Sequence, residues 1–403
     1  MSASPRHRTL LVSAIAAALA FGTVAEAQAQ TAAERLAERR AQREGSAARG
    51  RAPKAEPDYP NASRQEPGLS ASARLTPRIN EVAEAQQEGD LAAAEAAAQV
   101  VLENDRANAY ERAITLRLVS DLLVDSDPAR AKDYMRQVLE LDGLDNNQHY
   151  GTMLMLAQLQ LQDDENAEAL ATMDRFLAET KSDKGEHVAL RANILYRLER
   201  YGDAIAALEP IVRNNPEAQP QWRQLLLAAY TDADRTADAA ALAQEIAAST
   251  PGDKRAQLNL AAVYLQADDY PNAISVYERL RAEGQLSEEA EYRNLAALYL
   301  NSDGGEANAI SVLNEGLEKG ALPADDYRTW ALLAQAYYFT DQPQQAIEAY
   351  RKAAPLDKDG TSYLNLAKAL FNEGRNAEAK QAAQQALDKG LPNPDEARRL
   401  LAR

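Results

Sequence analysis

Apolar side chains recur at helical spacing from residue 79 onward, in pairs of segments that short polar breaks separate. In one such pair, Leu260, Ala261 and Tyr264 share one helical face, and Ala273 and Tyr277 share another after the break. Breaks this short require the two helices to lie antiparallel and side by side. The pattern therefore predicts a succession of helix hairpins.

One alanine recurs at the same place in the second helix of each hairpin. The gaps between successive alanines are 37, 38, 35, 35, 34, 36, 37 and 33 residues, and a nearly constant period of this size is typical of a solenoid. A small side chain at this place lets the two helix axes cross closely. The nine positions are Ala94, Ala131, Ala169, Ala204, Ala239, Ala273, Ala309, Ala346 and Ala379.

The eighth hairpin has the fullest set of repeated residues. They are Trp330, Leu333, Ala334, Tyr337, Ala346, Tyr350 and Ala353. This order resembles the tetratricopeptide repeat (TPR), whose unit of about 34 residues joins a Trp-x-x-Leu-Gly-x-x-Tyr helix to a second helix with recurring alanines. Units four to six match this pattern in part, and units one to three match it poorly outside the second helix.

The repeat pattern and the resemblance together predict an all-α fold, a right-handed α-solenoid of about nine TPR-like helix hairpins with a short C-terminal capping helix. The solenoid is expected over 78–392, with its first three units degenerate. The capping helix is expected over 393–403, with Asn393 as its cap, Pro394 in its first turn and Leu400 over the last repeat. Composition agrees, because Ala, Leu, Glu, Gln and Arg favour helices.

The N-terminus has the layout of a secretory signal peptide over 1–29. A short basic region precedes the apolar stretch Leu10–Phe21, and small residues then allow cleavage near Ala27 or Ala29. The alternative is an uncleaved membrane anchor, but such an anchor needs roughly 20 apolar residues. The absence of cysteine fits an oxidising compartment. We therefore expect an exported periplasmic protein with no membrane segment after signal removal.

Residues 30–77 differ in composition from the rest of the chain. They are rich in Gly, Pro, Ser and Ala and poor in large apolar side chains, which predicts a disordered linker. Residues 31–78 carry 10 basic and 6 acidic groups, whereas 79–403 carry 32 basic and 54 acidic groups. The basic linker is either a solubilising segment or an arm that binds an acidic partner or the acidic body.

The charge and the motifs limit the possible activities. The net charge of −17 disfavours nucleic acid and anionic membrane surfaces as partners. The three histidines are isolated in sequence, and neither a phosphate-binding loop nor a nucleophile elbow is present. We predict a non-enzymatic protein that holds no cofactor and no metal. An alternative of another class is a glycan-cleaving enzyme with two close carboxylates, one of them with a raised pKa.

Stacked helix hairpins present a long concave face lined by their first helices, and the resemblance implies that a peptide or protein partner binds there. Asparagines precede the motif leucine in three units, arginines lie near the same face, and two aromatic residues extend beyond the motif of the eighth unit. The predicted contacts are Arg255, Asn259, Arg293, Asn294, Arg328, Tyr338, Phe339 and Asn365. Alternatively, the asparagines recur because the repeat was copied, and the aromatic pair packs on the next unit.

The C-terminal half resembles a narrower group of proteins. The runs at 315–356 and 387–401 look like those of TPR proteins associated with the TonB–ExbB–ExbD systems of Gram-negative bacteria. This resemblance implies an accessory role in energy-dependent outer-membrane transport, with TonB, ExbB or ExbD components as partners. The alternative of the same kind is a periplasmic scaffold for envelope assembly or polysaccharide export.

Overall fold

The computed structural model describes residues 57–213 and 215–402. Nineteen α-helices and no strands form this part of the chain, which confirms the all-α class. None of these described helices has the length and apolar character needed to cross a membrane. The predicted signal peptide and residues 30–56 of the predicted linker lie outside the described residues. The chain divides into two compact units at Arg235 and Thr236, and each unit is described by itself.

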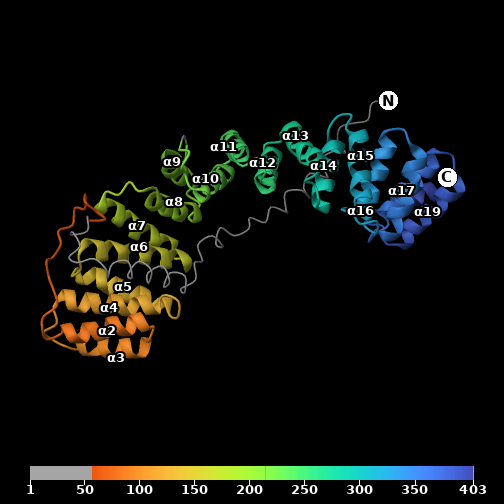
Figure 1. The fold of residues 1–403 in the computed structure, drawn as a ribbon. Coiled ribbons are helices and arrows are strands. Elements are labelled where there is room, and N and C mark those ends of the chain that lie inside the picture. The colour runs from red at the N-terminus through yellow and green to blue at the C-terminus, as the bar shows by residue number, and fades with distance from the viewer. Residues whose placement is uncertain (1–56, 214, 403) are drawn as a thin grey trace. The chain divides into compact units, whose positions relative to one another are not determined.

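In the N-terminal unit, consecutive helices pair, and each pair packs on the next (Figure 1). Leu75, Ile79, Val101, Ile114 and Val138 belong to one apolar core that the first two pairs share. The helices are α2 (Thr76–Glu88), α3 (Leu91–Leu102), α4 (Ala109–Leu123), α5 (Pro128–Leu141), α6 (Asn146–Gln162), α7 (Asn166–Thr180), α8 (Gly185–Arg197), α9 (Tyr201–Val212) and α10 (Pro220–Asp232).

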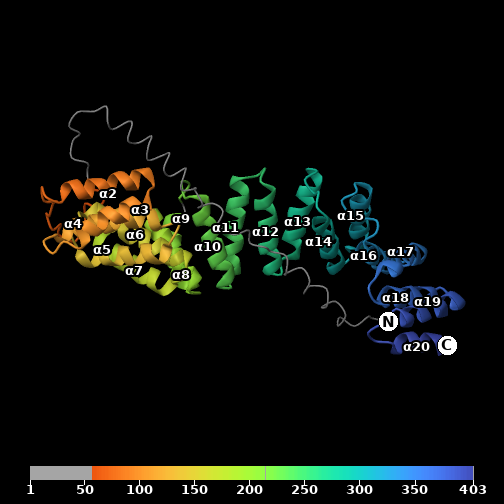
Figure 2. The same ribbon diagram turned by 90° about the horizontal axis from the view of Figure 1, so that it is seen from below.

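The C-terminal unit continues the same pairing, and Figure 2 shows its helices α12 to α15 side by side. Its last helix packs on both helices of the preceding hairpin. The helices are α11 (Thr236–Ser249), α12 (Lys254–Gln266), α13 (Tyr270–Ala282), α14 (Glu289–Asn301), α15 (Glu306–Glu318), α16 (Tyr327–Phe339), α17 (Pro343–Leu356), α18 (Thr361–Asn372), α19 (Asn376–Asp388) and α20 (Asp395–Ala402).

The nine repeated alanines occupy one structural position. Each is the fourth residue of its second helix, from α3 to α19, and none has more than 2% of its surface exposed. In the eight hairpins that lie within one unit the two helices are in contact, which confirms the close helix approach that the period predicts. The longest gap, 38 residues, spans α6, which has 17 residues where most other first helices have 12 or 13.

The turns inside the hairpins share a backbone feature. In many of them one residue has positive φ, for example Asp164 (58°), Asp268 (55°) and Gly374 (71°). A left-handed residue ends the first helix and reverses the chain within a few residues. Aspartates then begin several second helices, as Asp269 does by accepting a hydrogen bond from Asn272 N at 3.3 Å.

The last helix, α20, begins at Asp395, two residues beyond the predicted cap Asn393. Its Leu400 is buried, and the helix contacts α18 and α19. This confirms the predicted short capping helix, which covers the apolar end of the last hairpin.

Residues 57–75 differ from the expected disordered linker. This segment, which we call the strap, lies along the N-terminal unit where first helices begin and second helices end (Figure 1, red to orange). Its backbone forms turns but no helix or strand until α2 begins. The prediction of disorder was wrong for this segment because a few specific contacts, not a repeated apolar face, hold it in place.

We expect Ala273→Leu to destabilise the C-terminal unit by about 1–3 kcal/mol, because Ala273 is fully buried at the helix crossing and a larger side chain forces the helices apart. Thermal unfolding followed by circular dichroism measures the change. Ala282→Leu is the matched control, since Ala282 is exposed on the same helix α13. Equal melting temperatures for the two variants would contradict the role of the crossing.

Candidate partner-binding faces

The eight predicted contact residues all lie in the C-terminal unit, on the first helices α12, α14, α16 and α18. Arg255 and Arg328 are exposed, and the guanidinium of Arg328 lies 5.7 Å from the ring centre of Tyr327. Asn259 and Asn365 are half-buried. These four residues remain predicted partner contacts.

Two of the predicted residues connect neighbouring helices. Arg293 Nη1 lies 2.9 Å from Asp326 Oδ2, at the start of α16, and also pairs with Glu289. Asn294 Nδ2 donates a hydrogen bond to the Tyr277 hydroxyl at 3.4 Å. These contacts already use Arg293 and Asn294, so a partner has to share them or displace them.

Asp326 shows how strongly this junction is held. Burial alone raises the pKa of its carboxyl group, but hydrogen bonds from Thr329 and the backbone of Arg328, together with the charge of Arg293, lower the pKa overall. The carboxylate therefore stays ionised and caps α16. Sequence reasoning identified Arg293 but not this partner, which lies 33 residues further along the chain.

The aromatic pair at the end of α16 is the most exposed feature of this face. Tyr338 is 45% exposed and Phe339 is 61% exposed. Their rings meet edge to face at 5.8 Å, and Asn372 Nδ2 of α18 donates to the Tyr338 hydroxyl at 3.0 Å. Tyr338 thus contacts the next hairpin, which is the alternative to partner binding that the sequence left open. Much of its ring is nevertheless exposed to solvent.

The other motif tyrosines form a series of structural ties. Four of them, each near the end of a first helix, hydrogen-bond a polar side chain on the second helix of the preceding hairpin. The pairs are Tyr230 with Glu209 at 2.7 Å, Tyr299 with Glu278 at 2.9 Å, Tyr337 with Asn314 at 3.3 Å, and Tyr264 with Gln244. Burial, and then the bond to Glu278, raise the pKa of Tyr299 to about 12. The recurring tyrosines thus join the repeats, which distinguishes them from Tyr338 and Phe339.

The acidic residues with shifted pKa values are mostly ion-paired. Burial raises the pKa of Glu315, but Lys319 and Arg281 on either side lower it overall. Arg375 lowers the pKa of Glu378 in the same way. A glycan-cleaving acid needs a shift in the opposite direction, because it must keep its proton near neutral pH.

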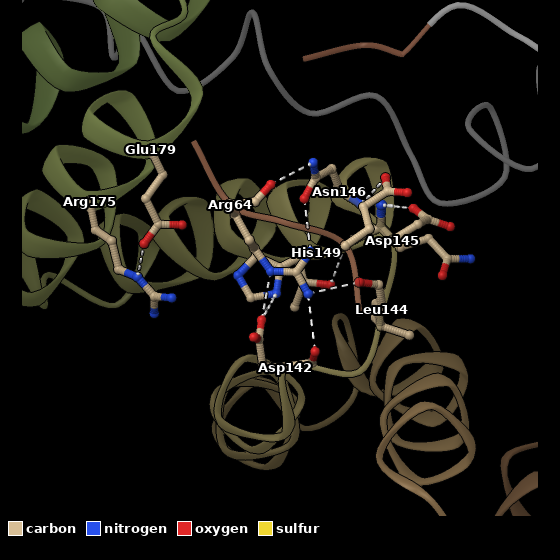
Figure 3. Close-up of polar contacts among 11 residues, drawn as sticks. Arg64, Asp142, Leu144, Asp145, Asn146, His149, Arg175 and Glu179 are labelled. Atoms are coloured by element: carbon tan, nitrogen blue, oxygen red, sulfur yellow. Dashed lines mark hydrogen bonds and ion pairs between the residues drawn. The ribbon is translucent and has the colours of Figure 1, made fainter. Parts of the chain in front are cut away.

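In the N-terminal unit, Arg64 of the strap fits into a cradle of oxygen atoms (Figure 3). Its Nε donates to Asp142 Oδ1 at 2.6 Å, and its Nη2 donates to the backbone oxygens of Asp142 at 3.1 Å and Leu144 at 2.8 Å. Its Nη1 donates to Asn146 Oδ1 at 2.8 Å. The Arg64 side chain is only 8% exposed, so this cradle replaces nearly all of its water contacts.

Tyr59 fills an aromatic pocket further along the strap. Its ring centre lies 5.1 Å from that of Tyr150, 5.6 Å from that of Phe176 and 6.3 Å from that of His187. Lys184 Nζ lies 5.7 Å from the Tyr59 ring centre. Edge-to-face contacts of this kind add to the burial of each ring.

His149 is completely buried next to Arg64. Neither ring nitrogen has a hydrogen-bond partner among the described residues, and Asp142 Oδ1 lies 3.6 Å from Nδ1. Burial, followed by the charge of Arg64, lowers the pKa of His149 to about 4. The imidazole is therefore neutral at neutral pH.

Comparison with known proteins identifies the repeat. Two family models, both described as tetratricopeptide repeat, match this chain, one at 189–254 and 225–288 and the other at 327–359 and 360–388. These stretches are tetratricopeptide repeats. They include units with the tyrosine ties, whereas the first three units, expected to be degenerate, fall outside the matches.

Solved structures similar to this chain include a tetratricopeptide repeat protein from Parabacteroides merdae ATCC 43184. It is 18% identical, and the match covers 65% of this chain and 99% of that one with a TM-score of 0.40. A second is Naa15/Naa10 bound to HypK-THB, 13% identical, covering 81% of this chain and 65% of that one with a TM-score of 0.28. A search of curated proteins found no match.

We expect the N-terminal unit to lose stability as the pH falls from 6.5 toward 4. The unfolded chain binds a proton at His149 near pH 6.5, whereas the folded chain binds it only near pH 4, so folding is favoured above this range. The maximal loss is about 3 kcal/mol. Denaturant unfolding at pH 7.5, 6 and 5 measures it. His149→Leu should flatten the dependence of the free energy of unfolding on pH. If this free energy falls equally with pH in the variant and the wild type, His149 is not the group responsible.

Proposed function

We propose that this chain is an exported periplasmic scaffold that binds a protein partner through α16 and α18, as an accessory of a TonB-type outer-membrane transport system. Its tetratricopeptide repeats support the general role, because such repeats form scaffolds for protein–protein interaction. The compartment and the transport system rest on the sequence, namely the signal-peptide pattern and the C-terminal resemblance.

The observation that carries the proposal is the exposed pair Tyr338 and Phe339. Large aromatic side chains supply much of the binding energy at protein interfaces, since they bury area at a low cost in side-chain entropy. The bond from Asn372 orients the Tyr338 ring before a partner arrives, which lowers that cost further. Arg328, exposed on the same helix α16, provides a charged group for the rim of the interface.

We expect Phe339→Ala to weaken partner binding by roughly 30-fold or more, the effect of losing a hot-spot contact of about 2 kcal/mol. The partner is first identified by chemical cross-linking in intact cell envelopes, and affinity is then measured with the purified pair. Leu356→Ala is the matched control, because Leu356 is also a large exposed apolar residue of this unit but lies at the end of α17.

The identity of the cross-linked partner decides between the two scaffold roles. Recovery of TonB, ExbB or ExbD that Phe339→Ala abolishes would support the transport role. Recovery of barrel-assembly or polysaccharide-export components without them would assign the alternative role. Equal binding by Phe339→Ala, Tyr338→Ala and the control would remove the aromatic pair as the contact site.

Export has its own test. We expect osmotic shock to release a mature chain that begins after Ala27 or Ala29, with the apolar stretch Leu10–Phe21 removed. Intact-mass spectrometry of the released fraction measures the N-terminus. A full-length chain that remains with the inner membrane would favour the uncleaved anchor.

A further inference from the structure

The strap consists of an anchored end and a largely exposed remainder. At the anchored end, Leu75 belongs to the apolar core, and Ser72 donates to Glu111 Oε1 through both its N–H, at 2.8 Å, and its hydroxyl, at 2.6 Å. Residues 65–70 are all exposed, and Gly68 among them has positive φ. Within this exposed stretch, residues 67–70 separate the anchored end from residues 58–66, which we call the clasp.

Side chains of the helices bind the backbone of the strap. Asn147 Oδ1 accepts from Asp58 N at 3.1 Å, Asn146 Nδ2 donates to Arg64 O at 3.3 Å, and Asn108 Nδ2 donates to Ser70 O at 3.0 Å. Hydrogen bonds to the backbone of a peptide hold it whatever its side chains are, and pockets for particular side chains then give specificity. Ser63 adds a backbone bond, since its N–H donates to Glu179 O at 2.8 Å.

Two side chains of the clasp supply specificity. Tyr59 enters the aromatic pocket and Arg64 enters the oxygen cradle, and these are the two clasp side chains with extensive buried contacts. The cradle offers acceptors to three guanidinium nitrogens, which a lysine cannot match with one ammonium group. The pocket and the cradle together form what we call the seat of the clasp.

The floor of the seat has polar atoms that the clasp leaves unpaired. Among the described residues, Gln148 Oε1 and both ring nitrogens of His149 are buried with no hydrogen-bond partner. His149 and Tyr150 lie beneath Arg64 and Tyr59 and are completely buried. Unpaired buried polar groups weaken a contact, so the contact of Arg64 with His149 is less favourable than a contact in which every polar atom is paired.

We propose that the seat is a peptide-binding site, that the clasp occupies it as a tethered ligand, and that the partner that replaces the clasp is a peptide with an aromatic residue followed five positions later by an arginine. The surface lies on the helix ends of α5 to α8 and is separate from the aromatic pair of the C-terminal unit. The seat contacts both the side chains and the backbone of the clasp. A partner that binds there in place of the clasp therefore has to offer the same groups.

The test uses a fluorescein-labelled peptide with the sequence of residues 57–70 and the full mature chain. A tethered ligand acts at an effective concentration in the millimolar range, so the wild-type chain should bind the probe weakly. The double variant Tyr59→Ala/Arg64→Ala frees the seat and should bind the probe at least tenfold more tightly in fluorescence anisotropy. A probe with alanine at both anchor positions should not bind, and Leu356→Ala should behave as the wild type.

Three results would overturn the proposal. The first is a folded double variant that does not bind the probe, and the second is equal binding of the alanine-substituted probe. The third is a concentration-dependent wild-type dimer that the double variant lacks, because this would assign the seat to a second copy of the chain.

Hydrogen exchange of the wild-type chain decides the matter if the double variant does not fold. A clasp that detaches exposes the Ser63 amide while the helices stay folded, so this amide should exchange at least 100-fold faster than the slowest amides of α6. If the Ser63 amide exchanges only as slowly as those α6 amides, the clasp stays bound until the helices unfold, and this result would overturn the proposal.

Discussion

The close crossing of two helices at one alanine is the constraint on which the repeats depend. A hairpin of this size cannot bury its apolar face alone, and a neighbour covers that face only if both helices of each pair lie close together. Within each unit, the buried alanines keep the pairs close. Because every pair then has nearly the same geometry, a tyrosine at a given motif position meets the same second helix of the preceding pair each time, as Tyr299 meets Glu278.

The same regularity separates structural from exposed residues on the candidate face. Tyr337 and Tyr338 are adjacent in sequence but point about 100° apart around the helix, so only one of them can join the repeat series. Tyr337 reaches Asn314 on the preceding hairpin, whereas Tyr338 reaches Asn372 on the following one and keeps an exposed ring. Phe339 has no polar group to pair, and its exposure is therefore the less expected of the two.

Periodicity made the helices, the anchor alanines and the capping helix predictable from sequence, because each depends on local spacing and on burial that repeats. The strap was not predictable, because Tyr59 and Arg64 are held by residues that lie far along the chain and belong to no repeat. The partner site was predictable only as a face. The spacing of the motif placed Arg293 on the first helix of its hairpin. Its pairing with Asp326 was not predictable, because Asp326 is the N-cap residue of α16 in the next hairpin.

The strap also affects the order in which the N-terminal unit folds. Contacts within a hairpin are local, whereas the strap joins Ser72 to Glu111, 39 residues away, and Ser63 to Glu179, 116 residues away. Contacts of such high contact order form late, since they require loop closure over structure that has already assembled. Translation makes residues 57–75 before the helices that receive them. The strap therefore leaves the ribosome before these helices but docks after them, and its docking marks the completion of four assembled hairpins.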